Sequence, residues 1–399
     1  MSQSSSPTTF SSDSPASAGQ LRVAIAGAGV IGLGIAWQLA RAGCTVDVFD
    51  AGMPGQGASH AAAGMLAACA EAEAGEEDLL VLNRLSQSLW PDFAAALEAA
   101  AGQAVDLRTE GTLTVGQTAD DAARLRHLLA LQTRLGLPVE WLSPAEARRR
   151  EPHLARQISG AIFSPEDHQV DNRKVAAALE AAARAAGVRI HPRAPVARVA
   201  STGGRVAGVE VNGALHPADA VVLAAGAWSR GIDIAPSAPL PVRPIKGQMA
   251  ALAMDPAAPL LTCVLWGPGI YLVPRRDGRL ILGATTEEKG FDPHLTAGGQ
   301  LSLFTYAWRV LPGIEELPIL EQWVGFRPGS RDDAPILGPS PEVEGLFYAT
   351  GHHRNGILLL PATVAALAAL VLEGRLETSL AGAVAPFGAG RFAAPKAAE

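Results

Sequence analysis

The segment Gly27-Ala-Gly29-Val30-Ile31-Gly32 places three glycines where an apolar run, Leu21–Ala26, gives way to a helix-like stretch. In a strand-turn-helix unit of this kind, Gly27 permits the tight turn, and Gly29 lets an anion such as a pyrophosphate approach the main chain. Gly32 lets the helix pack closely on the strand. The amides at the start of the helix then face the anion. The residue types and their spacing predict a phosphate-binding turn, formed by Gly27, Gly29, Val30, Ile31 and Gly32.

Asp50 closes the next strand-like segment, eighteen residues beyond Gly32. An acid about 20 residues after the third glycine typically binds the ribose of a dinucleotide and disfavours a 2′-phosphate. Three spaced glycines arise easily by chance in a chain with 42 glycines, so the surrounding strand, helix and acid carry the interpretation. Together they indicate NAD or the adenosine half of FAD, and spacing does not separate the two.

The segments that must position this site alternate between strand and helix. Asp219–Gly226 is an apolar run that ends in glycine, as a buried strand does, and Leu346–Thr350 is another short strand. Between them the chain is β-rich around one helix, Ala297–Val310, and a hairpin is expected within Val105–Val115. Because α/β elements occur at the start, middle and end of the chain, we predict an α/β fold whose Rossmann-type domain is discontinuous.

Length and composition fit more than one domain. The chain has 399 residues, of which 48% are apolar and 18% charged, enough for a large buried core. We predict a disordered tail over 1–20, a nucleotide-binding domain over 21–85, 155–235 and 330–375, a β-rich α+β substrate domain over 86–154 and 236–329, and a C-terminal tail over 376–399.

Charge and cysteine content exclude several classes of function. The net charge of -7 lacks long like-charge runs, which argues against nucleic-acid and membrane-surface partners. The three cysteines, Cys44, Cys69 and Cys263, are far apart, so neither a disulfide framework nor a zinc site is expected. His352 and His353 are adjacent and do not share a helix face, so we predict no metal site. These features, with no signal-like apolar segment in residues 1–20, favour the cytoplasm.

Two longer segments are much more specific than the glycine motif. Residues 327–338 read Arg-Pro-Gly-Ser-Arg-Asp-Asp-Ala-Pro-Ile-Leu-Gly, and residues 351–357 read Gly-His-His-Arg-Asn-Gly-Ile. Both resemble segments of the D-amino acid oxidase superfamily of flavoproteins, most closely the glycine oxidases associated with thiamine biosynthesis. With the segments 57–66, 221–229 and 244–248, the resemblance covers nearly all of Leu21 to Phe392.

The resemblance implies roles for three side chains. Arg327 matches the family's carboxylate-binding arginine, and Tyr271 matches a tyrosine whose phenol hydrogen-bonds the same carboxylate. Arg354 matches an arginine near the pocket and the flavin. Outside the family context, Arg327 reads as a surface charge, Tyr271 as a core or edge-strand residue, and Arg354 as a residue flanking the terminal helix.

The resemblance also implies non-covalent FAD, since no cysteine lies in a segment matching a covalent attachment site. The cofactor-binding residues it adds to the phosphate turn and Asp50 are Ser59, Ala63, Gly64, Met65, Val196, Gly226, Trp228, His353, Arg354, Asn355, Gly356 and Ile357.

Met65, Gly269 and Thr286 are expected to line the substrate pocket. The glycine oxidase used for comparison carries a histidine at the position of Gly269 and a methionine at that of Thr286. Both differences remove side-chain volume, so we expect a somewhat larger amino acid, or an N-alkyl glycine such as sarcosine, to be accepted.

The sequence thus predicts an FAD-dependent oxidase that transfers a hydride from a small amino acid to flavin N5, with oxygen as acceptor and hydrogen peroxide, ammonia and a keto acid as products. The resemblance further suggests a homotetramer. The alternatives are a D-amino acid dehydrogenase with another electron acceptor and a non-catalytic FAD-fold binding protein. A nicotinamide dehydrogenase is a weaker option, because no segment resembles its catalytic residues.

Overall fold

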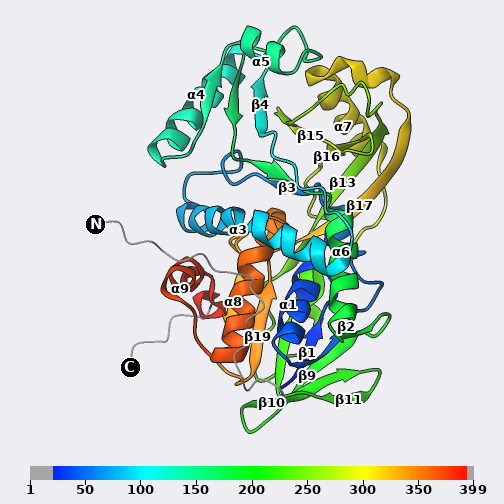
Figure 1. Ribbon diagram of the computed structural model, residues 1–399, viewed down its shortest axis with the longest axis vertical. Coiled ribbons are helices and arrows are strands. Elements are labelled where there is room, and N and C mark those ends of the chain that lie inside the picture. The colour runs from blue at the N-terminus through cyan, green and yellow to red at the C-terminus, as the bar shows by residue number, and fades with distance from the viewer. Residues whose placement is uncertain (1–20, 393–399) are drawn as a thin grey trace.

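A computed structural model describes residues 21–392, so the predicted tail over 1–20 and residues 393–399 lie outside the described residues. Two α/β units are stacked along the long axis of the molecule (Figure 1). One is built on a six-stranded sheet and the other on an eight-stranded sheet. The chain crosses between the two units several times, as expected for a discontinuous nucleotide-binding domain.

The six-stranded sheet has the order β18-β19-β12-β1-β2-β8 and is parallel except for the pair of β18 with β19. Its central strands are nearly continuous apolar runs, as in a sheet that is covered on both faces. The strands are β1 (Arg22–Ala26), β2 (Thr45–Phe49), β8 (Arg189–His191), β12 (Ala220–Leu223), β18 (Ile336–Pro339) and β19 (Leu346–Thr350).

Alternate side chains of this sheet enter two different cores. On β1, Val23 and Ile25 face a layer of helices, whereas Ala24 and Ala26 face a small antiparallel sheet. The helices are α1 (Val30–Arg41), α3 (Glu77–Ala101), α6 (Asn172–Ala185), α8 (Leu360–Glu373) and α9 (Thr378–Val384). The small sheet comprises β9 (Val196–Thr202), β10 (Arg205–Val211) and β11 (Ala214–Pro217).

The second unit is a largely antiparallel sheet of order β17-β13-β16-β15-β14-β4-β6-β5. Its strands are β4 (Thr112–Gly116), β5 (Glu140–Leu142), β6 (Gly160–Ser164), β13 (Arg243–Ala253), β14 (Val264–Gly267), β15 (Ile270–Pro274), β16 (Arg279–Gly283) and β17 (Ile319–Gly329). The helices α4 (Ala119–Arg134), α5 (Pro144–Arg150) and α7 (Ala297–Val310) belong to this unit. Between the units lie α2 (Ala58–Ala61), β3 (Met65–Leu66) and β7 (His168–Gln169), and the short 3₁₀ turns η1 (Gly226–Gly231) and η3 (His353–Asn355) flank the cavity described below.

The prediction of a hairpin within Val105–Val115 is wrong. Strand β4 pairs antiparallel with β6 and parallel with β14, and Arg108 makes only an isolated bridge to Gln169. Alternating apolar residues specify a strand and its buried face, but they do not specify a partner that is distant in sequence.

Other segments differ from the predicted domain boundaries. The boundary after residue 85 falls inside α3, which packs on α6 and α8 of the six-stranded unit through its apolar face. Strand β6, assigned to the nucleotide-binding domain, belongs to the eight-stranded sheet. The predicted C-terminal tail contains α9, whose Leu380 and Val384 are buried in the main core. Short amphipathic helices such as α9 give a weak sequence signal because tertiary packing supplies most of their stability.

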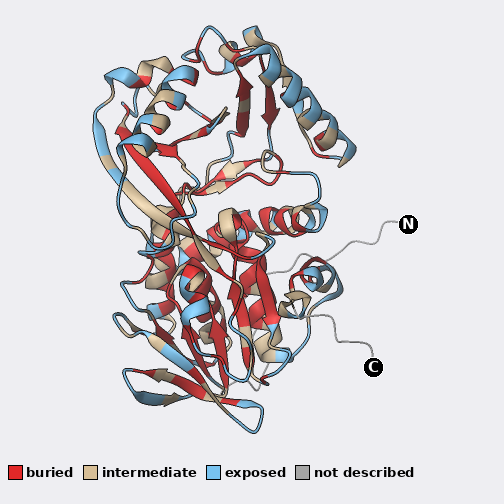
Figure 2. Cartoon of the chain, turned by 180° about the vertical axis from the view of Figure 1, so that it is seen from behind, coloured by how far each residue is buried: buried red, intermediate tan, exposed pale blue. Residues whose placement is uncertain are grey.

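Burial follows the two sheets. Figure 2 shows the strands of both units mostly buried and the outer faces of the helices exposed. No helix within residues 21–392 combines the length and apolar character needed to cross a bilayer. The predicted fold class, a discontinuous Rossmann-type domain with a β-rich second domain, is confirmed.

Candidate functional site

A cavity of about 880 Å³ runs from the phosphate turn to the inner face of the eight-stranded sheet. This volume lies near the upper end of the roughly 300–1,000 Å³ typical of ligand and cofactor sites. All but two of the predicted site residues line it. The exceptions are Gly32, which lies behind the turn, and Asn355, which is buried in η3. The lining residues are Gly27, Gly29, Val30, Ile31, Asp50, Ser59, Ala63, Gly64, Met65, Val196, Gly226, Trp228, Gly269, Tyr271, Thr286, Arg327, His353, Arg354, Gly356 and Ile357.

At one end, the carboxyl ends of β1, β2 and β12 meet around Gly27. Its φ is +109°, and a Cβ at this position would lie 2.3 Å from the carbonyl oxygen of Ala224. A Cβ on Gly32 would lie 1.9 Å from the carbonyl oxygen of Gly27. Both positions therefore require glycine, and the first turn of α1 is left facing the cavity as an anion-binding helix terminus.

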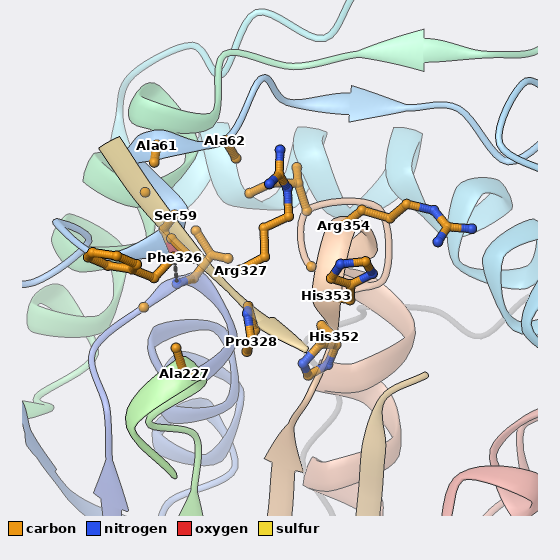
Figure 3. Close-up of a pocket in the computed structure, with 18 of the residues that line it drawn as sticks. Ser59, Ala61, Ala62, Ala227, Phe326, Arg327, Pro328, His352, His353 and Arg354 are labelled. Carbon is orange, nitrogen blue, oxygen red and sulfur yellow. Dashed lines mark hydrogen bonds between the residues drawn. The ribbon is translucent and has the colours of Figure 1, made fainter. Parts of the chain in front are cut away.

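Two polar side chains complete this end. The Asp50 carboxylate accepts hydrogen bonds from the amides of Ala28 and Gly52, each at 2.7 Å. A carboxylate offers about four acceptor sites, so it can still accept hydroxyl groups from the cavity. The Ser59 hydroxyl accepts from the amide of Val30 at 3.0 Å, which joins α2 to the start of α1 (Figure 3).

The middle of the cavity is lined by small residues of the segment 61–64. Gly64 has a φ of +68°, and a Cβ there would lie 2.1 Å from the carbonyl oxygen of Val170. The segment is fixed by the fully buried Arg275, whose guanidinium donates to the carbonyl oxygens of Ala63 and Val170, each at 2.7 Å, and to Asn172 at 2.9 Å. Burial lowers the pKa of Arg275 to about 10. Arg275 directly follows β15, so this side chain ties the end of that strand to the segment 61–64 of the cavity wall.

Arg327 and Tyr271 lie at the other end, on β17 and β15. Arg327 donates to the carbonyl oxygen of Thr285 at 3.1 Å, and it has no carboxylate partner within the described part of the chain. Its guanidinium lies over Gly247, where a Cβ would come within 2.6 Å of Nη1. The Tyr271 ring lies over Gly283, where a Cβ would come within 2.4 Å. Two glycines of neighbouring strands therefore make room for the two predicted substrate-binding side chains.

The environment keeps the Tyr271 phenol protonated. Burial raises its pKa, while the nearby Arg327 opposes the rise. Its hydroxyl donates to the sulfur of Met249 at 3.4 Å. A protonated phenol beside a guanidinium can donate to one oxygen of a carboxylate that the guanidinium binds.

Arg354 lines the cavity but does not point at Arg327. Figure 3 shows its side chain directed away from Arg327 and past His353. Its guanidinium contacts the carboxylates of Glu71 at 3.2 Å, Glu73 at 3.5 Å and Glu76 at 2.6 Å. The positive charge expected near the substrate is thus already balanced by acids of the segment 67–76.

The two adjacent histidines have different environments. His352 is buried, and its Nε2 lies 3.1 Å from the hydroxyl of Thr363; burial lowers its pKa to about 3. His353 lines the cavity with a φ of +46°, and burial lowers its pKa to about 4. Both are neutral at pH 7. No group of three or more His, Cys, Asp or Glu side chains placed to hold a metal is found within residues 21–392.

Comparison with known proteins decides the family. The family model for FAD dependent oxidoreductases matches residues 22–370. The chain belongs to this family. It is 39% identical over 361 residues to the bifunctional protein ThiO/ThiG of Trichormus variabilis, and it spans 54% of that relative's length. It is 38% identical over 367 residues to the glycine oxidase of Geobacillus kaustophilus, covering 92% of this chain and 95% of that protein.

Solved structures agree with this assignment. The crystal structure of the G. kaustophilus glycine oxidase matches with a TM-score of 0.86 at 36% identity, over 94% of this chain and all of that one. A glycine oxidase from Bacillus cereus matches with a TM-score of 0.82 at 29% identity. The predicted membership of the D-amino acid oxidase-like flavoproteins, and FAD as the cofactor, are confirmed.

The residues of this FAD dependent oxidoreductase fit the cofactor. The glycine turn offers bare backbone and a helix terminus where a pyrophosphate would lie, and Asp50 faces the place of a ribose. The segment 61–64 gives a flat wall of small side chains next to the substrate end. The three cysteines are buried, and none of them lines the cavity, so none is placed to attach a flavin covalently.

Several residues of the site carry no sequence signal that identifies them as part of it. Gly247 and Gly283 lie in predicted strands, where nothing in the spacing marks them as contacts of Arg327 and Tyr271. Glu71 and Glu73 lie in a loop with no motif, and their importance follows only from the contacts to Arg354. Arg275 was missed because a buried arginine has no local sequence signal.

Proposed function

We propose that this FAD dependent oxidoreductase oxidises glycine and other small primary or secondary amino acids, such as sarcosine and small D-amino acids. The main support is Arg327, a cation without a carboxylate partner among the described residues, which faces the end of the FAD-binding cavity beside a protonated phenol. This pair suits a substrate carboxylate, because a guanidinium binds both oxygens of a carboxylate in one plane.

The chain's own residues bind and orient the substrate in this proposal. Arg327 holds the carboxylate, Tyr271 donates a second hydrogen bond to it, and Met65 and Trp266 cover the remaining apolar surface. Bound FAD supplies a two-electron acceptor for the hydrogen on Cα. A neutral amine supplies the electron pair that forms the C=N bond, so no side-chain base is needed. The imino acid then reacts with water to give a keto acid and ammonia or an amine, and oxygen accepts the two electrons to give hydrogen peroxide.

Two small residues, Gly269 and Thr286, line the pocket. The Tyr306 ring fills the space beside Gly269, 3.2 Å from where a Cβ would lie, so the support for a larger substrate comes mainly from Thr286. Neither residue has the volume of the histidine and the methionine that the sequence analysis places at these two positions in a glycine oxidase. We therefore expect sarcosine, and not glycine alone, to be oxidised.

We also propose a cytoplasmic homo-oligomer that provides an imine for thiamine biosynthesis. The resemblance to glycine oxidases of that pathway and the relative named ThiO/ThiG support this role. Light scattering of the purified protein tests the oligomeric state, and thiamine auxotrophy of a deletion strain tests the pathway.

An anaerobic flavin-bleaching screen with glycine, sarcosine and D-amino acids tests the activity. We expect bleaching by glycine and sarcosine, and stoichiometric peroxide when air is admitted. Bleaching without rapid reoxidation by oxygen, together with reduction of a quinone or dye, would favour the D-amino acid dehydrogenase. A yellow protein that no amino acid bleaches would support the non-catalytic alternative.

A further inference from the structure

The substrate end of the cavity has an acidic wall, formed by Glu71 and Glu73 of the segment 67–76. Both residues line the cavity, as does Arg354, the cation that they contact. Met65, which lies just before this segment in the chain, packs against the same apolar cluster as Tyr271 and Trp266. The acidic wall therefore lies near the group that is expected to bind the substrate carboxylate, and the negative charge of Glu71 adds to the rise in the pKa of the Tyr271 phenol.

The charges on this wall do not cancel. Arg354 is shared among three carboxylates, because Glu76 contacts its Nη2 at 2.6 Å from outside the cavity lining. Arg327 has no such partner within residues 21–392. One cation is thus available for a ligand carboxylate, and the acidic wall, with three carboxylates around one guanidinium, carries excess negative charge.

The wall is held firmly in place. The carboxylate of the buried Asp167 accepts hydrogen bonds from the amides of Cys69 and Ala70, each at 2.9 Å. Gln87 of α3 donates to the carbonyl oxygens of Leu66 at 2.9 Å and Glu166 at 2.8 Å. These bonds fix the backbone that leads to Glu71, whose own amide donates to the carbonyl oxygen of Ala67 at 3.0 Å. Arg354 holds the Glu71 carboxylate through its Nε at 3.2 Å.

We propose that Glu71 and Glu73 make the site selective for amino acids with a single carboxylate, because they repel a second carboxylate on the side group of a ligand. This inference rests on the proposed function, because selectivity among substrates requires that the protein oxidise amino acids. The repulsion itself does not depend on that activity and acts on any bound anion. At the distances within a small pocket, like charges interact strongly when little water separates them.

Malonate and its monoamide, malonamate, test the charge alone. The two are similar in size, differ by one carboxylate, and lack the amine needed for oxidation. Their dissociation constants are measured from the change in flavin absorbance of the oxidised holoenzyme at pH 8.5. We expect the wild type to bind malonamate at least about tenfold more tightly than malonate.

Three variants locate the effect. Glu71→Gln should lower this preference about tenfold, and Glu73→Gln, whose side chain is 66% exposed, about two- to threefold. Glu76→Gln is the matched control, because it also removes a carboxylate partner of Arg354, whereas Glu76 does not line the cavity. In this variant the preference for malonamate over malonate should stay within about twofold of wild type. The exposed Glu73 variant keeps the test available if Glu71→Gln fails to fold, which a melting curve detects.

The inference is overturned if the wild type binds both compounds equally, if it does not bind malonamate, or if the preference is unchanged in both cavity-lining variants. An equal loss of preference in Glu76→Gln would also contradict it, because a freed Arg354 would then be the cause. Failure of the proposed function would be seen separately, as a holoenzyme that shows the malonamate preference but is bleached by no amino acid.

Discussion

The two ends of the cavity are built from different parts of the protein. At the dinucleotide end, Gly27, Gly29, Val30 and Ile31 of the turn line the cavity, and Asp50 follows directly after the neighbouring strand β2. At the substrate end, side chains from β15, β17 and the segment 67–76 converge, although they are separated by up to 256 residues in sequence. The first end depends on backbone shape and the second on the placement of charges.

This difference predicts different responses to mutation. A change at the dinucleotide end should affect FAD binding and stability together, because the turn is also part of the core. A change at the substrate end should affect turnover and leave FAD bound. Four experiments test this division.

Replacing Arg327 with methionine should give the largest effect. The change removes the cation expected to bind the substrate carboxylate while keeping much of the side-chain volume. Loss of a charge-assisted, bidentate contact should lower kcat/KM for sarcosine about 10³-fold, and Arg327→Lys should recover only part of it. Steady-state kinetics measure this, and flavin absorbance should show unchanged FAD content. Loss of FAD from Arg327→Met would contradict the division between the two ends.

Replacing Gly27 with alanine should affect the opposite end. The added Cβ would meet the carbonyl oxygen of Ala224 at 2.3 Å, in a conformation with a φ of +109° that alanine rarely adopts. We expect FAD affinity to fall at least about 10²-fold, with a lower melting temperature. Gly231→Ala is the control, because Gly231 also lines the cavity but has no atom within 4 Å of the added Cβ. Equal FAD affinity in both variants would show that the turn tolerates a side chain.

Replacing Gly283 with alanine tests the support beneath a substrate-binding side chain. The new Cβ would lie 2.4 Å from the Tyr271 ring, so the ring must move away from its place beside Arg327. A displaced binding group should lower kcat/KM about 30-fold with FAD retained. Gly298→Ala, in the first turn of α7 with nothing within 4 Å, should keep full activity. If Gly283→Ala is as active as this control, Tyr271 does not need its present position.

The same difference explains what could be predicted from the sequence. The phosphate turn, the strand that precedes it and the acid after it are adjacent along the chain, so spacing was enough to predict this end. Arg327 and Tyr271 were placed only by resemblance, because nothing in their local sequence indicates that β15 and β17 approach one cavity. Resemblance could not show that Arg354 is engaged by Glu71, since the partners are 283 residues apart. Contacts of this kind depend on tertiary packing, as does the pairing of β4 with β6.

The smallest predicted effect is a pH dependence confined to the substrate end. Burial raises the pKa of Glu71 to about 7, against the opposing influence of Arg354. Glu71 therefore gains a proton as the pH falls through 7, and the acidic wall loses part of its charge. The preference for malonamate over malonate should then weaken about threefold between pH 8.5 and pH 6.5, because most Glu71 is protonated at the lower value. Glu71→Gln should remove this dependence, since the amide does not titrate, and FAD affinity measured over the same range serves as the reference for the dinucleotide end. A preference that changes equally in Glu71→Gln and wild type would assign the titration to another group.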